Sequence, residues 1–272
     1  MYCRKGFTLM KSKSTHQARL APGTRLRRML MQFAILAEND LRRIPKTPRH
    51  SVHALRTRMK KLRSILRLAH GQIAPTAGTA ITRKARDAKD TFDAVRNQEV
   101  LNRLLKKWSS RGTAKIPGQK ISDAMLEQVR LLARKLQRLI AALPLDALRW
   151  TDLCRAHEKT YRSARRWMKR SASGNPEHLH HWRRRVKDLY YQSLALRHLG
   201  GMKRRIRQSH RLGSRLGKCH DLHLLQRCAG AKLSPAELKR VRRLQAELHK
   251  KIFAAGTKLF RDKPDHFGRS LS

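Results

Sequence analysis

Apolar residues recur at helical spacing along almost the whole of this 272-residue chain, and proline or glycine interrupts the pattern at short intervals. Between Thr24 and Arg43, for example, they follow three- and four-residue steps until Pro45 and Pro48 end the run. No stretch alternates polar and apolar residues over a useful strand length. The pattern predicts an all-α protein with helices at about 24–43, 50–70, 79–94, 97–109, 121–143, 149–171, 177–199, 202–216 and 219–229, and a last one that Ser234 caps.

The charge of the chain is strongly unbalanced, with 65 lysines and arginines against 18 acidic residues and a formal net charge of +47. Apolar residues make up 40% of the chain, which excludes a disordered basic tail. A folded protein with this charge is expected to bind a polyanion such as nucleic acid, an anionic membrane surface or a polyphosphate. Composition does not distinguish these partners, so the pattern of charges must.

One basic pattern occurs twice. In HALRTRMKKLR the residues His53, Arg56, Lys60 and Arg63 stand at offsets 0, 3, 7 and 10, and HHWRRRVKDLY repeats these offsets from His180. On a helix the four positions share one face over about 15 Å of axis, beside the apolar stripe. The second copy has Arg183 and Lys187 in register, but Tyr190 replaces the last cation. Each helix is therefore expected to bury one edge and to present a basic edge beside it.

A second similarity follows each basic segment. FDAVRNQEVLNRLL, around Asn97, resembles GKCHDLHLLQRCA, around Asp221, at a similar distance downstream. We interpret the two similarities as an internal duplication that predicts two four-helix bundles related by a pseudo-twofold axis. The predicted boundaries are a first bundle at 21–110, a linker at 111–120 and a second bundle at 121–261, with tails at 1–20 and 262–272.

These segments resemble the CHAD family, the conserved histidine α-helical domain, over most of residues 20–260. The resemblance rests on VHALRTRMKKLRSILRL, FDAVRNQEVLNRLL, TYRSARRW, HLHHWRRRVKDLYYQSLAL and LGKCHDLHLLQRC. It implies two four-helix bundles with a basic surface or central channel that binds inorganic polyphosphate, and association with polyphosphate granules. The phosphate-contacting candidates that it implies are His53, Arg56, Lys60, Arg63, Arg67, His180, Arg183, Arg184 and Lys187, followed by Arg162, Arg165 and Arg166 of the preceding helix.

Two alternatives concern the site itself. His53 and His180 could contact the ligand, in which case binding should strengthen as the pH falls, or they could be buried hydrogen-bonding residues that fix the bundle through Asn97 and Asp221. Asn97 stands where the family usually has an aspartate, which weakens such a role in the first half. Cys219 and His223 could share a helix face, but the paired spacing of a zinc site is missing, so we expect no metal or cofactor.

The competing function is nucleic-acid binding, because phosphodiester chains carry the same charge. Against it, the chain lacks RNP, KH and zinc-finger signatures. It also lacks a P-loop, a nucleophile elbow and an HExxH motif, so we expect a binding protein and not an enzyme. The few, irregularly spaced cysteines and the absence of a long apolar run favour a cytoplasmic protein without membrane insertion. The family resemblance implies a location at polyphosphate granules.

Overall fold

The computed structural model describes residues 20–110, 116–199 and 201–264; most of the predicted tails and residues 111–115 of the predicted linker lie outside these ranges. The described part consists of helices and connecting turns without a β-strand, which confirms the all-α class. None of its helices has the length and apolar composition needed to cross a bilayer. The α-helices are α3 (Pro22–Arg42), α4 (Pro48–Leu66), α5 (Pro75–Asp90), α6 (Asp93–Trp108), α7 (Asp123–Ala141), α8 (Trp150–Arg170), α9 (Pro176–Ala195), α10 (Met202–Ala229) and α11 (Pro235–Leu259).

Proline opens several of these helices. Pro48 and Pro75 stand in the first turns of α4 and α5, so both helices begin a few residues before their predicted starts. A proline is tolerated there because its missing N–H has no intrahelical partner at that position. The predicted Ser234 cap of α11 is confirmed, since the Ser234 hydroxyl accepts from the Glu237 N–H and the Glu237 carboxylate accepts from the Ser234 N–H.

The prediction of two helices at 202–216 and 219–229 is wrong, because α10 runs without a break from Met202 to Ala229. Gly213 and Gly217, whose helix propensity is low, lie where α10 packs against α9. A Cβ at Gly213 would lie 3.1 Å from Cε of Lys187, and one at Gly217 would lie 3.5 Å from the Arg183 guanidinium. The glycines give room for these α9 side chains, and the tertiary contact outweighs their low helix propensity.

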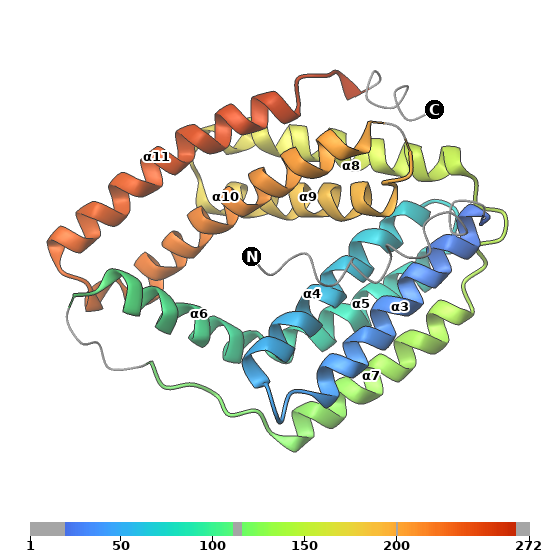
Figure 1. Cartoon of the computed structure of the whole chain (residues 1–272), viewed down its shortest axis with the longest axis horizontal. Helices are drawn as coiled ribbons and strands as arrows, with labels where there is room; N and C mark the ends of the chain where they lie inside the picture. Colours follow the sequence, from blue (N-terminus) through green and yellow to red (C-terminus); the bar gives the residue numbers. More distant parts are fainter. Residues whose placement is uncertain (1–19, 111–115, 200, 265–272) are drawn as a thin grey trace.

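The helices form two groups that face each other (Figure 1). One contains α3, α4, α5 and α7, the other contains α8 to α11, and α6 runs between them with contacts to α10 and α4. The sequence analysis placed α7 in the second bundle. It packs on α3 and α5 instead, where it buries the apolar stripe Val129, Ala133, Leu136 and Ile140. The pseudo-twofold relation between the groups stays a prediction.

A buried polar contact joins the two groups where α4 packs against α9. The Ser64 hydroxyl donates to the Asp188 carbonyl at 3.1 Å, and the Gln192 side-chain amide donates to the Ser64 carbonyl at 3.0 Å. The Gln192 amide oxygen lies 3.2 Å from Nδ1 of His157 on α8. All three side chains that make these contacts are fully buried. Hydrogen bonds in such a setting fix one sliding position of α4 against α9, because any other would leave buried polar groups unpaired.

We expect Gln192→Ala to lower the free energy of unfolding by about 2 kcal/mol, because the Ser64 carbonyl and Nδ1 of His157 lose the hydrogen bonds that Gln192 makes to them in a buried site. Gln128→Ala on the exposed face of α7 is the matched control, with a change expected within about 0.5 kcal/mol. Unfolding in urea, followed by circular dichroism, measures both. Equal losses in the two variants would contradict a special role for the α4–α9 contact.

Candidate anion-binding site

The basic faces of α4 and α9 meet across the interface between the two groups. Lys60 of α4 lies within electrostatic reach of both Arg183 and His180 of α9. Farther along the same helices, Arg63 is influenced by Arg184. The two stripes that the sequence identified separately therefore form parts of one site.

Further cations reach this site from α5, α6 and α10. Lys89 of α5 lies near Arg56, Arg63 and Arg184, and Arg96 of α6 lies near Arg183. We call the whole set the basic cluster. It consists of His53, Arg56, Lys60, Arg63, Arg67, Arg86, Lys89, Arg96, Arg103, His180, Arg183, Arg184 and His220.

The cations of the basic cluster destabilise one another. Desolvation, together with the neighbouring cations Arg56, Arg183, Arg96 and Lys89, lowers the pKa of Lys60 well below its ordinary value. Desolvation and nearby arginines lower the pKa of Lys89 to about 8, although its ammonium pairs with Asp90 and, at 3.2 Å, with Asp93. Lowered pKa values of this kind mean that the protein itself compensates these charges incompletely. An anion bound here would supply that compensation.

Lys60 combines access to solvent with a crowded surrounding. Its side chain keeps contact with solvent, and yet protein surrounds it closely enough for desolvation to be the largest cause of its lowered pKa. The positive potential around its ammonium is high, because the neighbouring cations add up and the nearby protein screens them less than water would.

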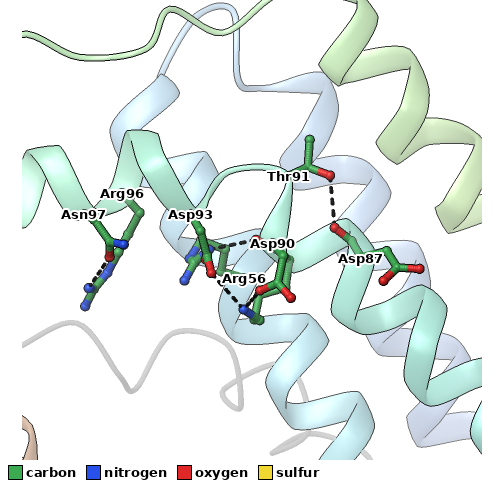
Figure 2. A network of polar contacts seen from close by, with 8 residues as sticks. Arg56, Asp87, Asp90, Thr91, Asp93, Arg96 and Asn97 are labelled. Atoms are coloured by element: carbon green, nitrogen blue, oxygen red, sulfur yellow. Dashed lines mark hydrogen bonds and ion pairs between the residues drawn. The ribbon is translucent and has the colours of Figure 1, made fainter.

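Arg56 already has partners in the protein. Its side chain is 8% exposed, forms an ion pair with Asp93 at the start of α6 and donates to the Lys89 carbonyl at 2.7 Å (Figure 2). These contacts tie α4 to the junction of α5 and α6. Arg56 was predicted to contact phosphate, but the structure gives it an anchoring role within the fold.

The counterpart of Arg56 in the second half, Arg183, is placed differently. Its Nε is buried without a hydrogen-bond partner in the described part of the chain, and its guanidinium lies beside the backbone of Gly217. Desolvation has the largest effect on the pKa of Arg183 and lowers it. Asp221 raises this pKa, and Arg96 lowers it. The carboxylate of Asp221 lies 3.8 Å from Arg103, so Asp221 is shared among several cations. Arg183 is therefore the better candidate for a direct contact with an anion.

A structural role for the two repeated histidines would require hydrogen bonds from His53 to Asn97 and from His180 to Asp221. Among the described residues, no hydrogen bond joins His53 to Asn97 or His180 to Asp221; Asn97 accepts from Arg96 instead, at 3.2 Å. His53 is exposed, and the ring of His180 lies 5.0 Å from that of His220. Desolvation and the neighbouring arginines lower the pKa of His180 to about 4 and of His220 to about 3.

Other predicted site residues lie at the margin of the basic cluster. Arg67 pairs with Asp188 of α9 at 3.1 Å, and Arg184 is exposed. The Lys187 ammonium lies 5.7 Å from the ring of Tyr190 and, together with desolvation as the larger cause, lowers the pKa of His210, so Lys187 lies beside these two rings.

The α8 arginines belong to another surface. Arg162 pairs with Glu158 on its own helix at 2.6 Å, Arg165 lies near Tyr161, and Arg166 is exposed on the same helix. Helix α8 packs against α9 and α11 and contributes no member of the basic cluster. The structure thus does not bring these three candidates together with the others.

Sequence reasoning missed five members of the basic cluster, namely Arg86, Lys89, Arg96, Arg103 and His220. Two of them carried a usable signal, because Arg96 and His220 directly precede Asn97 and Asp221 in the repeated segment. No comparable signal marks Arg86 and Lys89, which α5 brings to the site only through its packing on α4.

The Cys219 and His223 side chains share a face of α10, as the spacing predicted, with 3.9 Å between Sγ and Nδ1. Within the described ranges, no three histidine, cysteine, aspartate or glutamate side chains are placed to hold one metal ion.

One known protein family matches most of the chain. Residues 25–230 match the model of the CHAD domain. The chain belongs to the CHAD domain family. The matched region runs from α3 to the end of α10 and contains every member of the basic cluster. A comparison with curated proteins finds no match. The resemblance stated from the sequence is thereby confirmed at the level of the family, while the predicted domain boundaries at 21 and 261 stay a prediction.

Because Arg56 and Arg183 have different surroundings, we expect their replacement by methionine to change the stability of this CHAD domain differently. Arg56→Met should lower the free energy of unfolding by about 2 kcal/mol, because the Lys89 carbonyl and Asp93 lose a charged partner. Arg183→Met should leave it within about 0.5 kcal/mol or raise it, because a desolvated cation is removed from among like charges. Chemical denaturation in low salt measures both, and a larger loss for Arg183→Met would contradict the assignment.

Proposed function

We propose that this CHAD domain binds inorganic polyphosphate through the basic cluster. The observation that carries the proposal is the meeting of Lys60 with Arg183 and His180, since two helices of different groups place cations together with too few carboxylates to balance them. Guanidinium groups bind phosphate through two parallel hydrogen bonds, and lysine acts as a point charge. A chain of phosphates can follow the cluster from one group of helices to the other.

Polyphosphate fits the density of the cations better than a nucleic acid does. Lys60 has four cationic neighbours close enough to shift its pKa. In polyphosphate, charged groups follow one another through single bridging oxygens, whereas sugars separate the phosphates of nucleic acids. Single-stranded nucleic acids also gain affinity from stacking on aromatic side chains. The basic cluster contains histidine rings but no tryptophan, tyrosine or phenylalanine, and Trp182 of α9 is fully buried in the core.

The second candidate, nucleic-acid binding, is favoured by cations that lie outside the cluster. Lys239 and Arg242, for example, are exposed on α11 and add to a net charge of +47. A surface of this kind attracts any polyanion in low salt. Polyphosphate binding should depend on the cations of the basic cluster, whereas binding through general charge should depend on all exposed cations alike. Variants that remove the same number of charges inside and outside the cluster therefore distinguish the two candidates.

The proposal is for a binding protein located at polyphosphate granules in the cytoplasm. Its site consists mainly of cations that hold an anion in place. Phosphate release from polyphosphate in the presence of magnesium, measured with purified protein, would instead indicate an enzyme.

A competition titration tests the proposal. Labelled long-chain polyphosphate is bound at fixed salt and displaced with unlabelled polyphosphate, duplex DNA or structured RNA at equal phosphate concentration. We expect polyphosphate to displace the label at the lowest concentration. Arg183→Met/Arg184→Met should weaken polyphosphate binding at least tenfold, because each lost charged contact contributes about 1.5 kcal/mol or more.

Lys239→Met/Arg242→Met is the matched control, since it removes the same charge from the exposed face of α11. It should weaken binding less than threefold at physiological salt. If both variants behave alike, or if nucleic acid competes as well as polyphosphate, general charge explains the binding and the nucleic-acid candidate takes precedence.

Binding should become weaker as the pH rises. His180 and His220, with pKa values of about 4 and about 3, are neutral at pH 7 in the unbound protein, and Lys89, at about 8, is partly so at higher pH. A bound polyanion favours their charged forms and raises these pKa values, so binding takes up protons. Calorimetry in two buffers of different ionisation enthalpy should show net proton uptake between pH 5 and pH 9. Proton release would contradict a ligand that faces these groups.

A further inference from the structure

The two halves of the site differ at corresponding positions. In the register that aligns His53 with His180, His181 of the second half corresponds to Ala54 of the first. In the register that aligns Asn97 with Asp221, His220 corresponds to Arg96 and His223 to Glu99. The second half thus has four histidines where the first half has one histidine, one alanine, one arginine and one glutamate.

The four histidines lie together in a cavity of about 770 Å³ between the beginning of α9 and the C-terminal part of α10. Its lining includes His180, His181, His220, His223, Gln226 and Arg227. The cavity adjoins the basic cluster, because His180 and His220 belong to both and Arg183 influences both rings. Glu177 adds one carboxylate to the lining and Arg227 adds one guanidinium, so their formal charges cancel.

The corresponding positions of the first half have different chemistry. Arg56 is held by Asp93 and the Lys89 carbonyl, whereas Arg183 faces Gly217 and keeps a buried Nε without a partner in the described residues. Glu99, the counterpart of His223, would repel a phosphate. An anionic chain therefore meets two chemically different ends of the same site.

The chemistry of the cavity matches the end of a phosphate chain. An internal phosphate carries one charge and only accepts hydrogen bonds, whereas a terminal phosphate has a second proton that dissociates near pH 6, as in other phosphate monoesters. It can therefore both donate and accept. A neutral imidazole also donates with one nitrogen and accepts with the other. Four imidazoles and one arginine fork can thus pair with either protonation state of a terminal group.

We propose that this histidine-lined cavity binds the terminal phosphate of a polyphosphate chain, whose following phosphates cross the basic cluster toward Lys60. The inference rests on the proposed function and adds a direction to it, with the chain end in the second half. His181 and His223 are then residues that determine specificity for chain ends, while Arg183 contacts the chain as a whole.

The test compares two short polyphosphates of one length, one with free ends and one with both terminal phosphates blocked as alkyl esters. Wild-type protein should bind the free-ended chain about tenfold more tightly. His181→Ala/His223→Ala should bind both chains with the affinity that wild type shows for the blocked one. His198→Ala is the control outside the cavity, where the ring packs against Trp150, and it should keep the preference.

The double variant also distinguishes a preference due to charge from recognition of the chain end by the histidines. Blocking the ends removes some negative charge, and a preference due to charge alone would survive in His181→Ala/His223→Ala. Equal affinity of wild type for the two chains, or an unchanged preference in this variant, would overturn the cavity assignment and leave the proposed function standing. Failure of wild type to bind either chain, or long-chain polyphosphate, would overturn both.

Because His181 stacks on Trp167 with ring centroids 4.5 Å apart, thermal unfolding of each variant accompanies the titrations. If the double variant does not fold, His223→Ala alone and the wild-type comparison of free and blocked chains still decide the question.

Discussion

The contact between α4 and α9 is the constraint on which the site depends. Cations on two helices that face each other repel, and without a strong opposing contact the helices would separate. Ser64 and Gln192 provide part of that contact through hydrogen bonds that require one sliding position, and the apolar side chains Leu62 and Leu189 are fully buried beside them. The position that satisfies these groups is the one that brings Lys60 to Arg183. Folding thus holds together charges that would otherwise move apart, and a bound anion would relieve the repulsion.

The equivalent arginines of the two halves differ in how the fold pairs their charge. Arg56 joins α4 to the start of α6 through Asp93 and the Lys89 carbonyl, as Figure 2 shows. Arg183 lies against Gly217 and carries a charge that the fold does not fully pair. Under the proposed function, the arginine of the first half stabilises the fold and the arginine of the second half is the one that meets the ligand.

The sequence predicted the helices and the basic stripes because both depend on local spacing along the chain. The stripe at His53 and the stripe at His180 were found by their offsets alone, and the structure brings Lys60, Arg63, His180, Arg183 and Arg184 into one cluster. What failed depended on tertiary packing. Helix α7 joins the first group because of the partners of its apolar stripe, and Gly217 lies inside a helix because α9 needs the space. Similarly, no local pattern distinguishes Arg56 from Arg183, since their difference comes from residues on other helices.

The continuity of α10 has a mechanical consequence. A helix of 28 residues is about 42 Å long, and α10 carries Gly213 beside Lys187, Gly217 beside Arg183 and the cavity residues His220 and His223. These features therefore share one helix axis, along which residues are spaced by 1.5 Å as long as α10 stays helical. The order in which α10 meets Lys187 and Arg183 and presents its two histidines is thus set by the position of a single element against α9.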